Sequence, residues 1–313
     1  MDHFQRNAEG VLSAEDVSLK DIAESYGTPT FVYAKATLER HVRVLREGVA
    51  DIPHSLCYAI KANSNLAILE TLGELGCDFD AVSIGEFVQA LKAGAKPKQI
   101  ILSGVGKRDD EIRSALKWGT RYVCVESFEE LKAVEEIAAN EGVQAPVAVR
   151  VNPDVDAKTH PYIATGLKQN KFGVAWNQVH ELYRWGMTRS SLSLIGVTCH
   201  IGSQLTRIEP FVDAAERIGV LARELLESGV QLRYVGMGGG LGIPYTYEND
   251  FLTLAFNKEY SKTDTIYLAI EYTAKPNELE ANGGKAITDN RGLYFINPKG
   301  ETKNKPKHDL FND

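Results

Sequence analysis

Residues 121–151 run RYVCVESFEELKAVEEIAANEGVQAPVAVRV, and this stretch decides the fold. Apolar residues gather in two short runs, Arg121–Glu126 and Pro146–Val151, whose length is typical of buried strands. Between them, three apolar residues recur at helical spacing: Leu131, Val134 and Ile137. The order strand, helix, strand predicts a parallel pair, because parallel neighbours need a crossover connection.

Capping signals mark the two ends of the predicted helix. Ser127 followed by Glu130 has the form of a capping box, and Gly142 is a suitable stop. The same signals occur earlier in the chain, at Ser83, Glu86 and Gly76. We therefore expect repeated strand–helix units.

The unit recurs along most of the chain. The predicted strands are Ser55–Ile60, Phe79–Ser83, Gln99–Ser103, Arg121–Glu126, Pro146–Val151, Leu194–His200 and Arg233–Gly238. Polar candidate residues lie mostly at the carboxyl ends of these strands, where barrels of this class place their active sites. The sequence thus predicts an α/β fold of the (β/α)8 barrel type rather than a doubly wound sheet.

Composition narrows the class of protein. Hydrophobic residues make up 43% and charged residues 25% of the 313 residues, as in ordinary globular proteins. The net charge of −7 argues against nucleic acid or an anionic membrane as a partner. There is no apolar signal stretch and no run of the ~18 apolar residues that a membrane span needs. The cysteines have no zinc spacing, so we expect buried free thiols in a reducing cytoplasm: Cys57, Cys77, Cys124 and Cys199.

Lys61 is the first candidate for chemistry. It lies in YAIKAN (residues 58–63), at the end of an apolar run and the mouth of a predicted loop. A partly desolvated lysine has a lowered pKa and can act as an amine nucleophile toward a carbonyl. Taken alone, a loop lysine is more often a solvated charge, so the hypothesis depends on other residues.

Two later loops give that support. The glycines of MGGGLG (residues 237–242) let backbone N–H groups cradle a phosphate, although the motif by itself is also typical of a flexible turn. In HIGSQ (residues 200–204), His200 can lie flat on an aromatic ring and Ser203 can bind a phosphate or phenolic oxygen. By itself, His200 is also explained as a structural histidine.

Other polar residues have two explanations each. Asp80 and Glu86 are possible electrostatic partners near a strand end, but Glu86 is explained equally well as a helix cap. The irregular stretch 150–173 is a candidate substrate lid. Within it, Arg150 fits either a site residue or a structural ion-pair partner. A reactive lysine, a phosphate cradle and a stacking histidine together point to pyridoxal 5′-phosphate and an amino-acid substrate.

Several motifs resemble one enzyme family. They are YAIKAN (58–63), DAVSIGE (80–86), RVNPDVDAKTH (150–160), TGLKQNKFG (165–173), HIGSQ (200–204) and GGGLGIPY (238–245), with IAESYGTPTFVY (22–33) before them. In this order they resemble diaminopimelate decarboxylase, a fold-type III decarboxylase with an alanine-racemase-like barrel, over about residues 15–247.

The resemblance implies roles for individual residues. Lys61 would be the Schiff-base lysine and His200 the ring-stacking residue, while Ser203, Gly239 and Gly240 would contact the phosphate. Asp80 would support the cofactor site. The implied reaction releases CO2 from meso-diaminopimelate and gives L-lysine in a homodimer, without a metal. We do not find the family's Glu-Pro-Gly-Arg and Cys-Glu-Ser motifs, so the expected barrel is incomplete, without its last strand and C-terminal β-domain.

The composition changes near residue 249, beyond which Arg291 is the one arginine. We expect an N-terminal segment (1–34), a truncated barrel (35–249) and an unrelated β-rich tail (250–313). The tail has two predicted strands, Phe251–Phe256 and Thr265–Tyr272.

DTIYLAIEYTAKPNE (264–278) and GLYFINP (292–298) resemble the N-terminal β-domain of aminopeptidase-N-like zinc peptidases, but there is no HExxH zinc motif. Three hypotheses follow for the whole chain: a diaminopimelate decarboxylase, a barrel that binds pyridoxal phosphate without turnover, or a non-functional fusion.

Overall fold

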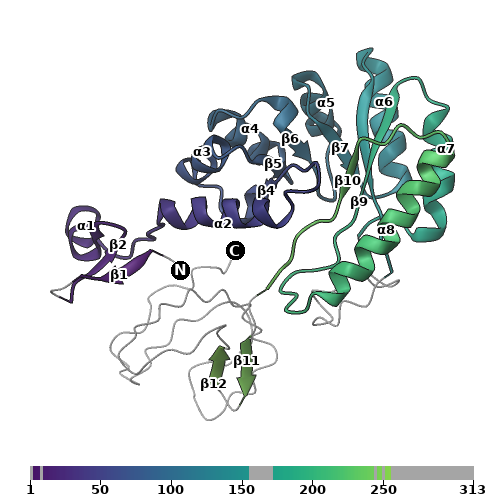
Figure 1. Cartoon of the computed structure of the whole chain (residues 1–313). Helices are drawn as coiled ribbons and strands as arrows, with labels where there is room; N and C mark the ends of the chain where they lie inside the picture. Colours follow the sequence, from purple (N-terminus) through teal and green to yellow (C-terminus); the bar gives the residue numbers. More distant parts are fainter. Residues whose placement is uncertain (1–2, 8–9, 155–171, 243–244, 249–250, 255–313) are drawn as a thin grey trace, which may run out of the picture. The chain divides into compact units, whose positions relative to one another are not determined.

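A computed structural model describes residues 3–7, 10–154, 172–242, 245–248 and 251–254 (Figure 1). Its strands are β1 (Phe4–Arg6), β2 (Leu12–Ala14), β3 (Val17–Ser18), β4 (Cys57–Ala59), β5 (Asp78–Ala81), β6 (Ile100–Leu102), β7 (Tyr122–Val125), β8 (Ala145–Arg150), β9 (Leu192–Thr198), β10 (Tyr234–Gly236), β11 (Tyr245–Glu248) and β12 (Phe251–Leu254). Its α-helices are α1 (Leu19–Tyr26), α2 (Lys35–Gly48), α3 (Leu66–Glu74), α4 (Ile84–Lys92), α5 (Asp109–Trp118), α6 (Phe128–Glu141), α7 (Val179–Met187) and α8 (Glu209–Glu227). Short 3-10 turns are η1 (Ile60–Ala62), η2 (Pro97–Gln99) and η3 (Trp176–Gln178).

The central sheet has the strand order of a barrel. Within the described residues its seven strands pair in the order β10-β9-β8-β7-β6-β5-β4, and every pair is parallel. Each strand therefore lies beside its neighbour in sequence, whereas a doubly wound sheet reverses its order partway. The predicted incomplete barrel is confirmed: in the described part of the chain β4 and β10 form two open edges of a curled sheet.

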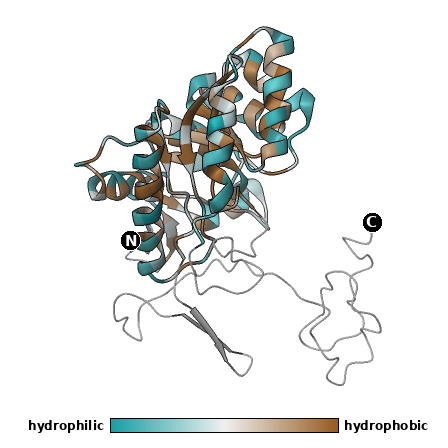
Figure 2. Ribbon diagram, turned by 90° about the vertical axis from the view of Figure 1, so that its right-hand side faces the viewer, coloured by the Kyte–Doolittle hydropathy of each residue, from teal (hydrophilic) through white to brown (hydrophobic). Residues whose placement is uncertain are grey.

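The cores lie on both faces of this sheet. Figure 2, which colours residues by hydropathy, shows brown apolar segments in the interior of the molecule, between the helices. On the helix-covered face, β7 and β8 pack against α6 through buried aliphatic side chains: Val123, Val125, Leu131, Val134, Val147 and Val149. On the other face a smaller cluster joins five strands: Ile101, Tyr122, Cys124, Ala148, Ile195 and Tyr234. Such near-continuous apolar strands are expected where both faces of a parallel sheet are buried.

An ion pair lies at the amino-terminal end of the sheet. Arg121, directly before β7, lies 2.6 Å from the carboxylate of Asp78 on β5. Its guanidinium also lies 5.7 Å from the ring centroid of Tyr234 on β10. The site described below lies at the opposite, carboxyl end of the strands.

The predicted helix caps form, with one difference. Ser83 Oγ accepts a hydrogen bond from Glu86 N, and Ser127 Oγ accepts one from Glu130 N. The two glutamates reach back one residue further than a capping box requires, to Val82 N and Glu126 N. At the other end of α6, Gly142 adopts the left-handed conformation that ends a helix.

One cysteine prediction is wrong. Cys77, Cys124 and Cys199 are buried free thiols, but Cys57 is exposed. Cys57 lies on β4, an edge strand in the described part of the chain, so no further strand covers it there.

The tail is described only in part. The antiparallel pair β11 and β12 lies on both sides of residue 249, and β12 falls within the predicted strand Phe251–Phe256. The second predicted strand, Thr265–Tyr272, and the motifs that resemble zinc peptidases lie outside the described residues. No described helix is long and apolar enough to cross a membrane.

Candidate active site

The predicted site residues follow the strands of one sheet. Lys61 comes after β4, Asp80 lies on β5, His200 comes after β9 and Gly239 comes after β10. Because the strands are parallel, their carboxyl ends meet at one edge. Electrostatic neighbours confirm this proximity, since Lys61 affects the pKa values of both Asp80 and His200.

Lys61 lies in the 3-10 turn η1, directly after β4. Lys61 is exposed among the described residues, so the partial desolvation that would lower the reactivity barrier of a lysine is not seen there. Lys61 follows β4, which in the described part of the chain pairs with β5 and has no strand on its other side. The amine is thus accessible to a molecule approaching the carboxyl end of the sheet.

His200 is half-buried beside two cations. Burial, Arg150 and Lys61 together lower the pKa of its imidazole to about 4. A histidine with that pKa is neutral at pH 7, and a neutral ring has less electrostatic repulsion toward a cationic or electron-poor aromatic ring.

Asp80 has a carboxylate oxygen without a partner. Burial raises the pKa of Asp80, while the hydrogen bond from Ser103 and the charges of Lys61, Arg150 and Lys107 lower it. Oδ1 of Asp80 is buried and has no hydrogen-bond partner among the described residues. An orphaned buried oxygen at a functional edge is a candidate ligand contact.

The glycine loop packs on the loop that carries His200 and Ser203. Leu205 N donates to Gly240 O over 2.8 Å, and Gly242 N donates to Leu205 O over 2.8 Å. A Cβ at Gly238 would lie 2.6 Å from Cys199 O, and one at Gly242 would lie 2.6 Å from Gln204. These glycines are therefore needed for close packing, and the interpretation as a flexible turn is wrong.

Gly239 differs from its neighbours. A Cβ atom at Gly239 would meet nothing within 4 Å. Gly239 and Ser203 are both exposed. Both residues are thus open to solvent at the edge where a phosphate is expected.

The contacts of Glu86 and Arg150 bear on the two interpretations that the sequence allowed for each residue. Glu86 binds Val82 N and caps α4, so the structure supports its explanation as a cap. Arg150 forms an ion pair with Glu126, and its charge also reaches Asp80 and His200. The ion-pair explanation of Arg150 is therefore confirmed, and its role in the site stays a prediction.

The candidate lid is described only at its ends. Val151 and Val174 form a parallel bridge, with Asn152 N donating to Val174 O over 3.0 Å. Residues 155–171 lie outside the described residues.

Sequence reasoning did not single out three residues near the candidate site: Ser103, Lys107 and Glu126. Each comes at or after the carboxyl end of a predicted strand, and that position was the signal available. Lys107 is no second nucleophile, because its three donors bind Gly104 O, Cys124 O (2.7 Å) and Glu130 Oε1 (2.6 Å).

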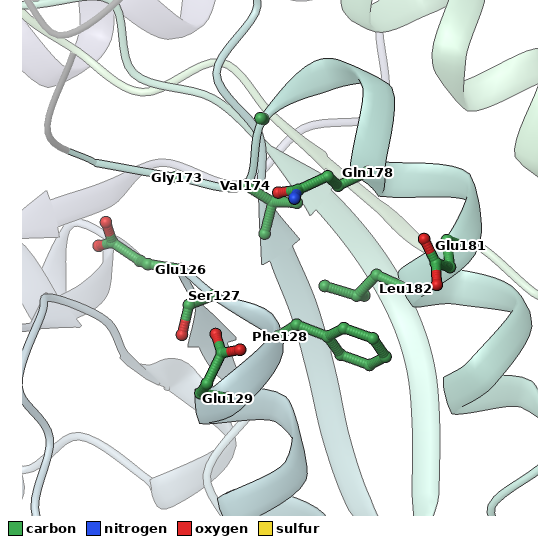
Figure 3. A pocket seen from close by; sticks show the side chains of 10 residues that line it. Glu126, Ser127, Phe128, Glu129, Gly173, Val174, Gln178, Glu181 and Leu182 are labelled. Atoms are coloured by element: carbon green, nitrogen blue, oxygen red, sulfur yellow. The ribbon is translucent and has the colours of Figure 1, made fainter. Parts of the chain in front are cut away.

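A cavity of about 270 Å³ lies between α6 and α7 (Figure 3). Its lining includes Glu126, Phe128, Glu129, Gln178 and Glu181 but none of the predicted site residues. No group of acidic, histidine or cysteine side chains in the described residues could hold a metal ion.

The residues present fit pyridoxal phosphate. The exposed amine of Lys61 suits its aldehyde, the neutral ring of His200 suits stacking, and the space beside Gly239 suits its phosphate. The orphaned Asp80 Oδ1 provides an acceptor for one of its polar groups.

Comparison with known proteins agrees with this fit. The family profile "Pyridoxal-dependent decarboxylase, pyridoxal binding domain" matches residues 35–288. Diaminopimelate decarboxylase of Vibrio cholerae is 47% identical over 248 residues, covering 79% of this chain and 60% of that protein. The Haemophilus influenzae enzyme of the same name is 42% identical over 296 residues, covering 93% of this chain and 68% of that protein.

The solved structures agree as well. Diaminopimelate decarboxylase of Helicobacter pylori, complexed with L-lysine, has a TM-score of 0.69 and 42% identity, covering 75% of this chain and 59% of that one. The chain thus spans about three fifths of the length of the first curated relatives it matches. The matched domain confirms pyridoxal phosphate as the cofactor, while the roles of single residues and the resemblance of the tail stay predictions. The chain belongs to the pyridoxal-dependent decarboxylases, in the diaminopimelate decarboxylase family.

Proposed function

We propose that the chain decarboxylates meso-2,6-diaminopimelate, releasing CO2 and giving L-lysine. One observation carries the proposal: Lys61, His200 and the glycine loop lie at one edge of the sheet in a chain 42% identical to a diaminopimelate decarboxylase over 296 residues. The L-lysine in the Helicobacter pylori structure is the product expected of this reaction.

When bound, pyridoxal phosphate supplies an aldehyde that captures amines and a ring that accepts the electrons left by departing CO2. Lys61 presents its amine at the mouth of the site, where its exposure leaves room for a substrate amine to approach. Neither the Lys61 amine nor the substrate amine has to enter a buried pocket to reach this position. The accessible position of Lys61 thus serves exchange between lysine and substrate.

His200 and the glycine loop orient the cofactor. With a pKa near 4, His200 stays neutral through the physiological range and offers a flat uncharged ring. Backbone N–H groups near Gly239 and the hydroxyl of Ser203 would bind the phosphate, as N–H groups of glycine loops do in other barrels. His200 would hold the ring of the cofactor, and Ser203 with the loop around Gly239 would hold its phosphate.

Release of CO2 tests this function directly. The full chain is loaded with pyridoxal phosphate, and CO2 is measured with meso-diaminopimelate, with ornithine and with arginine, each against a control without protein. We expect CO2 and L-lysine from meso-diaminopimelate alone, and none from the Lys61→Ala variant. Bound cofactor without CO2 above the control would overturn the proposal and favour a barrel without turnover.

The assembly and compartment of the chain are also proposals. The family resemblance implies a homodimer, which sedimentation of the loaded protein checks. The four free cysteines support a reducing cytoplasm, because thiols such as the exposed Cys57 persist there.

A further inference from the structure

Glu126 and Arg150 form a buried ion pair at the carboxyl end of the sheet. Glu126 follows β7 and Arg150 ends β8, and these strands are parallel neighbours. Arg150 Nη1 donates to Glu126 Oε1 over 2.9 Å. The side chain of Arg150 is only 17% exposed and that of Glu126 only 6%. The pair is thus shielded from water. A charged hydrogen bond is stronger in such a low-dielectric environment than it is in water.

Both partners are held in place from outside the pair. Glu130 Oε2 accepts a hydrogen bond from Glu126 N over 2.7 Å, which fixes the start of α6 against β7. The Arg150 guanidinium lies 5.6 Å from the ring centroid of Phe172. In the described part of the chain, Glu126 is the one carboxylate in ion-pair distance of Arg150. Without it, the long arginine side chain loses the contact that selects its conformation.

Glu126 lines one end of the cavity between α6 and α7, and its carboxylate is engaged by Arg150. In Figure 3 it points away from Phe128 and Leu182, which line the opposite part of that cavity. Its second oxygen, Oε2, is buried without a hydrogen-bond partner among the described residues.

The charge of Arg150 acts on the pKa values of two predicted site residues. It lowers the pKa of His200 and opposes the burial that raises the pKa of Asp80. The sheet register agrees: Arg150 lies opposite Thr198, the last residue of β9 and two positions before His200. A displaced Arg150 would change the charge on several sides of the site at once.

We propose that Glu126 is a positioning residue: its carboxylate holds the Arg150 guanidinium at the carboxyl end of the sheet, beside the strand end that leads to His200. It acts on pyridoxal phosphate through Arg150 and does not touch the cofactor. The proposal rests on the proposed function only in taking pyridoxal phosphate as the ligand.

The test measures cofactor affinity, with a matched ion pair as the control. Glu126→Gln removes the charge and keeps the shape. Asp78→Asn does the same to the Asp78–Arg121 pair, whose side chains are each 13% exposed and which lies at the opposite end of the sheet. Dissociation constants for pyridoxal phosphate are measured by absorbance titration, and melting temperatures are recorded for all variants.

We expect Glu126→Gln to weaken binding by about tenfold, as for coupled neighbouring residues. Asp78→Asn lowers the melting temperature but leaves the dissociation constant within about twofold. In an Arg150→Met background, Glu126→Gln changes the constant by less than about twofold, because the residue acts through Arg150. Glu126→Asp, which keeps the carboxylate, restores most of the affinity.

Three results would overturn the proposal: unchanged affinity in Glu126→Gln, an equal loss in Asp78→Asn, or an equal effect of Glu126→Gln with and without Arg150. The measurement concerns binding alone. A wild-type chain that binds the cofactor but releases no CO2 contradicts the proposed function and leaves this test intact.

Discussion

Gly240 packs so closely against Gly202 that a Cβ atom at position 240 would lie 1.8 Å from the Gly202 carbonyl oxygen. Gly240 also has a φ of +108°, which residues with a side chain rarely adopt. The two glycines join the loop after β10 to the loop that carries His200. The glycine loop and the loop that carries His200 therefore form one structural unit.

Gly240→Ala is expected to separate these loops and destabilise the fold by about 2–4 kcal/mol. Gly239→Ala is the matched control, because its Cβ has open space around it. We expect Gly239→Ala to melt like the wild type but to bind pyridoxal phosphate about tenfold more weakly, since the methyl group occupies the approach to the backbone. Thermal melts and absorbance titration check both. Equal melting temperatures for the two variants would contradict the close packing.

His200 is expected to stay neutral well below its usual pKa. Arg150→Gln and Lys61→Ala each remove a cation that lowers the pKa of His200, so each variant raises that pKa. Histidine NMR titration of the protein measures the values. A His200 pKa near 6.5 in the wild type would show that neither burial nor the two cations act on the ring.

The same shift makes stability depend on pH. Because the folded-state pKa of about 4 lies below the ordinary 6.5, the unfolded chain binds more protons between these values. The contribution of His200 to stability is therefore complete above pH 6.5 and is lost as the pH falls toward 4. We expect the fall in unfolding free energy from pH 7 to pH 4.5 to be smaller in His200→Asn than in the wild type. Parallel curves for the two proteins would contradict this.

Asp80 makes stability depend on pH in the opposite direction to His200. Burial is the largest influence on Asp80 and raises its pKa above 3.8, so the folded protein holds this proton more tightly than the unfolded chain. Stability from Asp80 is present below pH 3.8 and is lost as the pH rises through the folded-state pKa. We expect Asp80→Asn to be at least as stable as the wild type at pH 7 while binding pyridoxal phosphate more weakly, as residues kept for function often do. A variant that is less stable and binds equally well would contradict this.

Apolar spacing in the sequence predicted the order of the sheet well. Runs such as Arg121–Glu126 and Pro146–Val151 coincide with β7 and β8 because strands buried on both faces are continuously apolar. Ser83 and Ser127 were found because capping is a local interaction. Structural features that depend on residues a few positions apart can therefore be predicted from the sequence.

What failed depends on tertiary placement. Lys61 and Cys57 are exposed on or directly after β4, an open edge of the described sheet, and no local pattern reveals this. The need for Gly240 comes from a backbone 38 positions earlier, at Gly202 (240 minus 202). Glu126 gave no sign beyond its position at a strand end, because its partner Arg150 lies on the next strand. The family resemblance supplied roles that spacing alone left open.

The central claim is that Lys61 holds the cofactor. The most direct measurement is borohydride reduction of the protein loaded with pyridoxal phosphate, followed by mass spectrometry of its peptides. We predict one modified peptide, with the cofactor attached at Lys61, and its absence in Lys61→Ala. Attachment at another lysine, such as the buried Lys107, or no attachment at all, would contradict the account.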